Sequence, residues 1–365
     1  MGQKRTSLEL IAVLCVCMSP RLVTAQHSDG LVPGAEFSAG ANLIEKNVKA
    51  QGTIFVPDDA KVVRAVIVVV EGWPGAERGV YDATGRKLDD AEAARHMGSD
   101  NTPAPEPDLA VGRFRDQAWR GAARSCECAL LHLRLGTIRP EMSGGVVRNG
   151  VVIRNGISNR LIRTAGEGGA DALFSILADL AEDSAHMELK NARLVLWGWS
   201  ATASFATTFA ELHPERTVAF IRYHTHLRGL SPDIAVLKNI PGLLIAGGKD
   251  ELAGTEDAET LWRRGRSAGA PWTFAAEPDA THASEEAVVA SHQLILPWIA
   301  AVVRLRIASS GETLRPLSGD GQWLGNQQTA EAALHATFSG TKNAASWLPD
   351  ESTARGWQAV IRAAR

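Results

Sequence analysis

Short apolar segments alternate with amphipathic segments through the middle of this chain, and this alternation limits its fold more than any other feature. The apolar segments are rich in valine, isoleucine and leucine and are expected to be strands: residues 52–56, 62–70, 128–135, 194–197, 218–223, 243–246 and 272–276. Helices are expected between them, at residues 108–124, 170–180, 257–267 and 285–304, with another around Phe205 and Phe209. Such a pattern is typical of a mostly parallel sheet with helices on both faces. The sequence therefore predicts the α/β class.

The residues around Ser200 match a sharp turn from a strand into a helix. An apolar strand ending near Trp197 leads into Gly198-Trp199-Ser200, which small helix-forming residues follow. A serine on such a turn has its hydroxyl exposed at the end of the sheet, as a serine nucleophile requires. Ser200 is therefore the candidate nucleophile. The alternative is a serine that only caps the helix.

Two further polar side chains follow later strands. Asp250 comes directly after the strand at 243–246, and His282 lies in the loop after the strand at 272–276. Because ligands sit at the carboxyl ends of parallel strands, we expect Ser200, Asp250 and His282 at one edge of the sheet. In this hypothesis His282 is the base that activates Ser200, and Asp250 orients the imidazole.

Other residues could take these roles. Glu251 is the main alternative to Asp250, and Asp257 is a weaker one. His292 is a poorer candidate base than His282 because it lies within a helical pattern. His224 and His226 follow the strand after the turn, so they are candidates for substrate contact together with Trp199.

Backbone N–H groups near Ser200 are expected to stabilise an oxyanion. The first donor is the N–H of Ala201, at the start of the helix. The second should lie after the early strand, in Glu71-Gly72-Trp73-Pro74. Because Pro74 has no N–H, Trp73 is the expected donor.

The ends of the chain suggest its domain organisation. Residues 1–25 combine Lys4 and Arg5, an apolar stretch and small residues before Ala25, which predicts a signal peptide and an exported protein. The alternative is an uncleaved anchor. Residues 26–304 are the predicted α/β domain, and residues 305–365 a helical extension packed on it. Asp350 or Ser352 could cap the helix of this extension.

The mature chain would retain two cysteines, Cys126 and Cys128. Residues two apart in a strand are near the outer limit for a disulfide, so two buried thiols are favoured over a strained bond. Farther along, Val-Val-Arg-Asn-Gly-Val-Val at 146–152 predicts a hairpin. The arginines of residues 134–163 are expected to be solvent-exposed, with contact to an acidic substrate as the alternative.

Composition excludes several classes of protein. The chain of 365 residues is 45% hydrophobic and 22% charged, which is typical of a globular protein. Its formal net charge of −3 gives no basic field for nucleic acid. No stable membrane insertion is expected once the signal is cleaved, and no metal or organic cofactor is implied.

Three motifs resemble those of the α/β-hydrolase superfamily, over residues 52–304. Gly198-Trp199-Ser200-Ala201 resembles the nucleophile elbow, Gly248-Lys249-Asp250 the acid turn, and Thr281-His282 the histidine loop. Two positions depart from the family pattern. Thr202 replaces the second glycine of the elbow, and Glu71 stands where many relatives have a histidine.

Residues 198–229 are similar to exported bacterial esterases, including feruloyl esterase and polyester depolymerase relatives. The resemblance implies a serine hydrolase that cleaves small or polymeric carboxylic esters through an acyl-enzyme. The alternatives are a peptidase or an acyltransferase with the same three residues, or a non-catalytic binding protein on this scaffold.

Overall fold

The computed structural model describes residues 31–72, 78–82, 88–89, 92, 95, 109–138, 146–148, 151–155, 165–227, 230–282, 285–308, 313–317 and 321–362. The strands of its main sheet are β1 (Gly34–Leu43), β2 (Val48–Pro57), β3 (Ala65–Gly72), β5 (Cys128–Thr137), β8 (Leu194–Trp199), β9 (Thr217–Tyr223), β10 (Gly242–Gly247) and β11 (Trp272–Glu277). The predicted signal peptide, residues 1–25, lies outside the described residues.

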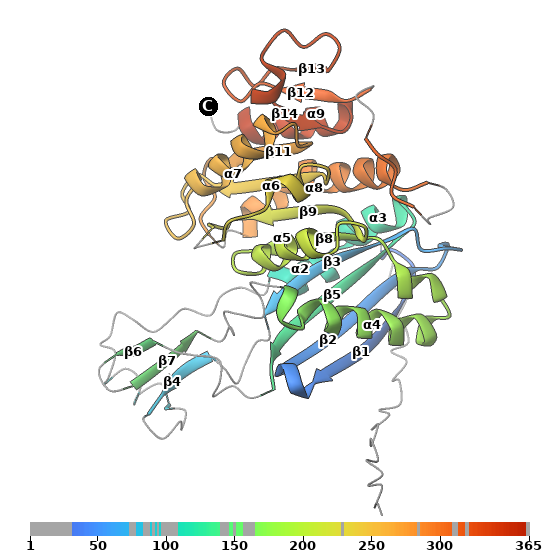
Figure 1. Cartoon of the computed structure of the whole chain (residues 1–365), viewed down its shortest axis with the longest axis vertical. Coiled ribbons are helices and arrows are strands. Elements are labelled where there is room, and N and C mark those ends of the chain that lie inside the picture. Colours follow the sequence, from blue (N-terminus) through green and yellow to red (C-terminus); the bar gives the residue numbers. More distant parts are fainter. Residues whose placement is uncertain are drawn as a thin grey trace, which may run out of the picture.

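The eight strands lie in the order β1-β2-β5-β3-β8-β9-β10-β11 (Figure 1). Pairing is antiparallel between β1 and β2 and between β2 and β5, and parallel between all other neighbours. The predicted α/β class is therefore confirmed, with a sheet that is mixed at one end. The sequence did not predict β1, whose residues are mostly small or polar.

Helices cover both faces of this sheet. They are α2 (Leu109–Arg115), α3 (Gln117–Ser125), α4 (Gly169–Ser184), α5 (Thr202–Leu212), α6 (Ile234–Leu237), α7 (Glu256–Ser267) and α8 (Glu285–Arg306). Alternate residues of β3 point to opposite faces. Ile67 and Val69 belong to the apolar core that α3 and α8 cover, whereas Val66 and Val68 belong to the core under α4 and α5 (Figure 1). Both cores position the loops at the ends of the strands.

The single helix predicted at 108–124 is two helices. The break falls at Asp116, whose side chain accepts a hydrogen bond from the N–H of Ala118 at 2.7 Å. Asp116 therefore caps α3, because its carboxylate satisfies a donor that has no acceptor within the helix.

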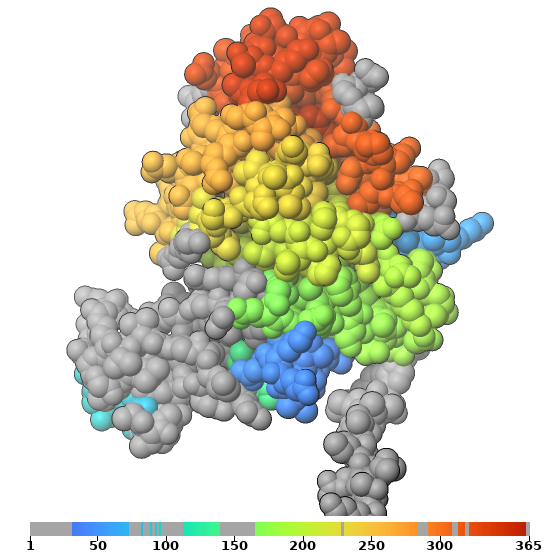
Figure 2. All heavy atoms as spheres, in the orientation of Figure 1, coloured from blue at the N-terminus to red at the C-terminus, as the bar shows by residue number. Residues whose placement is uncertain are grey.

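The C-terminal extension contains the predicted helix and a small sheet that was not predicted. Its strands β12 (Trp323–Gly325), β13 (Ala332–Leu334) and β14 (Ser346–Leu348) precede α9 (Glu351–Arg362). Asp350 caps this helix by accepting from the N–H of Thr353 at 2.8 Å. In Figure 2 the extension, in red, forms the end of the molecule farthest from β1.

Side chains of the extension form hydrogen bonds with backbone groups on the outer edge of β11, the last strand of the main sheet. The N–H of Phe274 donates to Oγ of Ser346 at 2.9 Å. The carbonyl of Phe274 accepts from Nε2 of Gln327 at 2.8 Å and from Nε1 of Trp357 at 2.7 Å. At Phe274, side chains therefore occupy the hydrogen-bonding positions that another strand would use.

A second small sheet consists of β4 (Arg78–Tyr81), β6 (Val146–Arg148) and β7 (Val151–Asn155). The antiparallel pairing of Arg148 with Val151 confirms the predicted hairpin. Short 3-10 helices are η1 (Ile44–Lys46), η3 (Ala165–Glu167), η4 (Met187–Asn191) and η5 (Lys342–Ala344).

Cys126 and Cys128 are buried and unbonded to each other, as the sequence favoured. Within the described ranges, no helix combines the length and the apolar character that crossing a membrane requires.

Candidate active site

The turn that carries Ser200 joins β8 to α5 in a strained conformation. Ser200 has φ 53°, in the left-handed region that costs a non-glycine residue about 1–2 kcal/mol. Its N–H donates to the carbonyl of Tyr223 at 3.0 Å, which ties the turn to β9. A side chain at Gly198 would lie 2.3 Å from the carbonyl oxygen of Thr202, so only glycine fits there. These contacts hold the turn in the geometry that the sequence predicted.

Thr202, at the second glycine position of the elbow pattern, is accommodated by its own hydrogen bonds. Its Oγ1 donates to the carbonyl of Trp199 at 2.8 Å and accepts from the N–H of the same residue at 3.0 Å. The residue is buried at the first position of α5. The threonine therefore closes the turn rather than crowding it.

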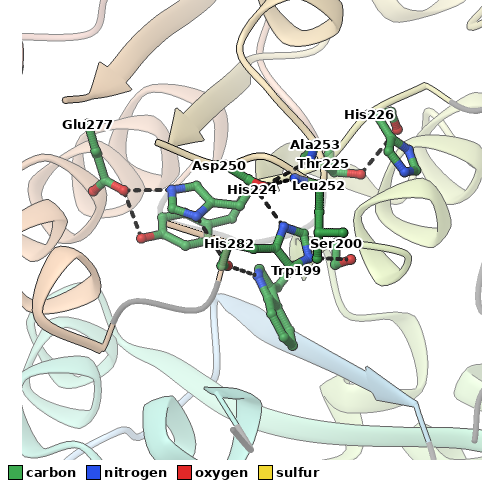
Figure 3. Close-up of polar contacts among 11 residues, drawn as sticks. Trp199, Ser200, His224, Thr225, His226, Asp250, Leu252, Ala253, Glu277 and His282 are labelled. Atoms are coloured by element: carbon green, nitrogen blue, oxygen red, sulfur yellow. Dashed lines mark hydrogen bonds and ion pairs between the residues drawn. The ribbon is translucent and has the colours of Figure 1, made fainter. Parts of the chain in front are cut away.

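The structure brings the side chains of Ser200, His282 and Asp250 together (Figure 3). Nε2 of His282 lies 2.9 Å from Oγ of Ser200, and Nδ1 lies 2.9 Å from Oδ2 of Asp250. Because an ionised carboxylate only accepts, Nδ1 of His282 carries the proton and Nε2 is left to accept from the serine hydroxyl. This tautomer is the one that a general base requires.

The alternative residues lie elsewhere. Glu251 is exposed, whereas the side chain of Asp250 is fully buried against His282. Asp257 accepts from the N–H of Leu227 at 2.8 Å. His292 accepts from Nε1 of Trp119 at 3.0 Å.

The electrostatics of Asp250 favour its ionised form. Burial alone would raise the pKa of this carboxyl, but hydrogen bonds from His282 and from the N–H of Ala253 outweigh it and hold the pKa below its ordinary value. Oδ1 of Asp250 accepts from the N–H groups of Leu252 and Ala253 at 3.0 and 2.9 Å. Each oxygen of the carboxylate therefore has a donor. In its ionised form, Asp250 can orient the imidazole of His282.

Two side chains hold the main chain of His282. Nε1 of Trp199 donates to the carbonyl of His282 at 2.9 Å, and the two rings lie 5.3 Å apart between centroids. Nδ1 of His224 lies 3.3 Å from the same carbonyl oxygen. Trp199, which was expected to contact substrate, is half-buried and supports the histidine loop from the elbow.

His224 is fully buried, and the prediction that it contacts substrate does not fit this position. Its Nε2 lies 2.8 Å from Oε2 of Glu277, which also accepts from the hydroxyl of Tyr223 at 2.9 Å. The rings of Tyr223 and His224 stack with centroids 4.1 Å apart. His226 is half-buried and lies two residues after His224, on the same segment (Figure 3).

The predicted oxyanion donors are only partly within the described residues. Ala201 is the cap residue of α5, where backbone N–H groups have no acceptor inside the helix. Trp73 lies outside the described residues. Glu71, near the end of β3, accepts from Nε2 of His132 at 2.7 Å and from Nε of Arg134 at 2.9 Å. The carboxylate at this departure from the family pattern is therefore paired with a cation.

Sequence reasoning missed the buried polar group behind His282, which includes Glu277, Tyr223 and Arg113. The guanidinium of Arg113 lies 4.4 Å from the ring centroid of Trp197, and burial lowers its pKa to about 10 despite the nearby Tyr223 and Glu277. The available signal was positional: Tyr223 and Glu277 are the last residues of β9 and β11, at the edge of the sheet that carries Ser200.

The fold and the site together define an α/β-hydrolase fold: a serine on a strained turn after a central strand, with acid and histidine in later loops at the same edge. The chain is similar in structure to a ferulic acid esterase (13% identity, TM-score 0.46, 75% of this chain and 99% of that chain) and to a thermostable esterase (13% identity, TM-score 0.37, 66% and 54%). No protein-family model and no curated protein matches the sequence. Within the described residues, no group of three or more His, Cys, Asp or Glu side chains could hold a metal ion.

Proposed function

We propose that this protein is a serine hydrolase that cleaves carboxylic esters through a covalent acyl-enzyme. The observation that supports this proposal most directly is the hydrogen-bonded series from Ser200 through His282 to Asp250, with both distances at 2.9 Å. A serine hydroxyl needs an adjacent base, and the base needs a group that fixes its tautomer.

In this mechanism Oγ of Ser200 attacks the ester carbonyl while Nε2 of His282 takes the hydroxyl proton. The tetrahedral intermediate collapses, the bond to the alcohol breaks, and His282 returns the proton to the leaving oxygen. A water molecule, deprotonated by the same nitrogen, then attacks the acyl carbonyl. The bond from the acyl carbon to Oγ of Ser200 breaks, His282 returns the proton to Oγ, and the carboxylic acid leaves. The carboxylate of Asp250 stabilises the imidazolium in both halves of the reaction.

The strained turn at Ser200 places a backbone N–H where it could donate to the oxyanion. The N–H of Ala201 follows the nucleophile directly, at the positive end of the α5 dipole. We assign it as one donor to the oxyanion and retain Trp73 as the proposed second donor. A donor of this kind stabilises the transition state by about 3–4 kcal/mol.

The test is hydrolysis of p-nitrophenyl acetate and butyrate by purified protein. Ser200→Ala should abolish turnover and prevent labelling by a fluorophosphonate probe. Ser204→Ala is the matched control, because Ser204 is a buried serine in the first turn of α5, four residues after Ser200. Turnover that survives in Ser200→Ala, or labelling of another residue, would contradict the proposal.

A separate measurement distinguishes cleavage of an ester bond from cleavage of an amide bond. We expect p-nitrophenyl esters to be cleaved much faster than the matching p-nitroanilides, because the acyl-enzyme forms more readily when an alcohol leaves. Comparable rates on both would identify a peptidase instead. A series of acyl chain lengths and aromatic acids then defines the acyl specificity.

A further inference from the structure

A cavity of about 740 Å³ lies at the amino ends of the strands, between the main sheet and the C-terminal extension. Pro214, Ile240 and Pro271, which precede β9, β10 and β11, line one side of it. Leu324 and Trp347 of the extension line another. Ser200 follows the carboxyl end of β8, and β8 to β11 are parallel, so this cavity is at the opposite edge of the sheet from the candidate active site.

The charged residues that line the cavity are all basic. They are Lys238, Arg266 and Arg306, together with the titratable His335. Among the described residues that line it, there is no aspartate or glutamate. The cavity therefore has a positive potential and an apolar wall that includes the indole of Trp347.

Arg266 is a buried cation whose partners are all neutral. It is 5% exposed, and its Nε and Nη2 donate to the carbonyls of Ala345 and Lys342 at 2.6 and 2.7 Å. Nη1 donates to the carbonyl of Ala270. Burial lowers the pKa of this guanidinium to about 10. Within the part of the chain that the structure describes, no carboxylate forms an ion pair with it.

Arg306 is a second buried cation that lines this cavity. It is 7% exposed, and Nη1 donates to the carbonyl of Arg315 at 2.8 Å. Its Nε is buried and, among the residues that the structure describes, has no hydrogen-bond partner. Burial lowers the pKa of this group as well. A buried positive charge without a counter-charge is costly, so two of them lining one cavity indicate that an anion completes the site.

We propose that this cavity is a binding site for a small organic carboxylate, separate from the candidate active site. A carboxylate accepts hydrogen bonds from a guanidinium in the plane of its fork and neutralises its charge. In this proposal the guanidinium of Arg306 binds the carboxylate, Arg266 and Lys238 add positive charge, and Trp347 packs against the apolar body of the ligand. The site does not depend on the proposed esterase activity.

The test uses 4-iodobenzoate as probe and the full chain with Ser200→Ala, which removes turnover at the other edge of the sheet. A crystal grown with the probe should show the anomalous signal of iodine in the cavity. Calorimetry should give about tenfold weaker binding in Arg306→Gln, because one charge-assisted hydrogen bond is lost. Arg304→Gln is the matched control: Arg304 is on the same helix but is exposed and paired with Asp350.

Three results would overturn the proposal: no iodine signal in the cavity, equal affinity in Arg306→Gln and Arg304→Gln, or binding of inorganic phosphate without binding of the carboxylate, which would identify an adventitious ion only. If Arg306→Gln does not fold, the position of iodine in protein with an intact Arg306 still decides the question. Lys238→Gln then supplies the affinity measurement, since Lys238 is exposed and its replacement leaves the core intact.

Discussion

The hydroxyl of Thr202 bonds to both main-chain polar groups of Trp199, accepting from its N–H at 3.0 Å and donating to its carbonyl at 2.8 Å. These two residues flank Ser200, whose backbone is in a strained left-handed conformation. The two hydrogen bonds therefore help to offset that strain, and the elbow depends on a side chain where its pattern usually has glycine.

Thr202→Val should weaken the elbow while keeping the shape of the side chain. The N–H and carbonyl of Trp199 lose their partner, which should cost about 1–3 kcal/mol of the free energy of unfolding. Urea denaturation measures this cost, and ester hydrolysis should fall because Ser200 is less well held. Thr202→Ser keeps the hydroxyl and should retain most of the stability and most of the ester hydrolysis. Equal loss in the two variants would show that the methyl group, not the hydroxyl, matters.

Asp250→Asn should cut turnover by about 10³- to 10⁴-fold, because an amide favours the wrong tautomer of His282. Glu251→Gln, which changes the exposed neighbour, should leave turnover close to that of the unaltered protein. The ratio of kcat values for the two variants checks the assignment. A larger loss in Glu251→Gln would move the orienting role to that residue.

The same carboxylate should contribute a pH-dependent part of stability. Its pKa in the folded protein lies below the ordinary value of 3.8. A lowered folded pKa means that the stabilisation is present above the ordinary value and is lost as the pH falls through the folded pKa. Urea denaturation between about pH 6 and pH 2.5 should show the stability difference from Asp250→Asn shrinking as the pH falls. A difference that is constant with pH would contradict this.

Nε2 of His224 faces the carboxylate of Glu277, and its Nδ1 faces the carbonyl of His282. His224→Phe keeps the stacking on Tyr223 but leaves the buried carboxylate with one donor fewer, at a cost of about 3–5 kcal/mol. Adding Glu277→Gln to that variant should restore part of the stability, and no recovery would mean that the loss comes from packing.

Gly356→Ala should destabilise the contact between α9 and α8. An added Cβ at Gly356 would lie 2.0 Å from the carbonyl oxygen of Gln293, so the helices must separate, at a cost of about 1–3 kcal/mol. Gly112→Ala is the control, because Gly112 is an exposed helical glycine with nothing within 4 Å of such a Cβ. It should gain about 0.5–1 kcal/mol. Thermal unfolding of the two variants should therefore shift in opposite directions.

The structural features that depend on a local sequence pattern could be predicted. The strand, turn and helix around Ser200 are contiguous, and Asp250 and His282 each follow a predicted strand, so their common edge could be inferred. The role of His224 could not, because it depends on Glu277, 53 positions away and on another strand. The sheet of the extension was missed because strands of three residues are too short to show a period of two.

The side chains that bind the outer edge of β11 at Phe274 also block one place where a second copy of this chain could pair. An uncovered edge strand is a template for another chain, and Phe274 is the point where Ser346, Gln327 and Trp357 occupy that template. The extension therefore occupies, at Phe274, the position at which a strand of another molecule would otherwise pair with β11.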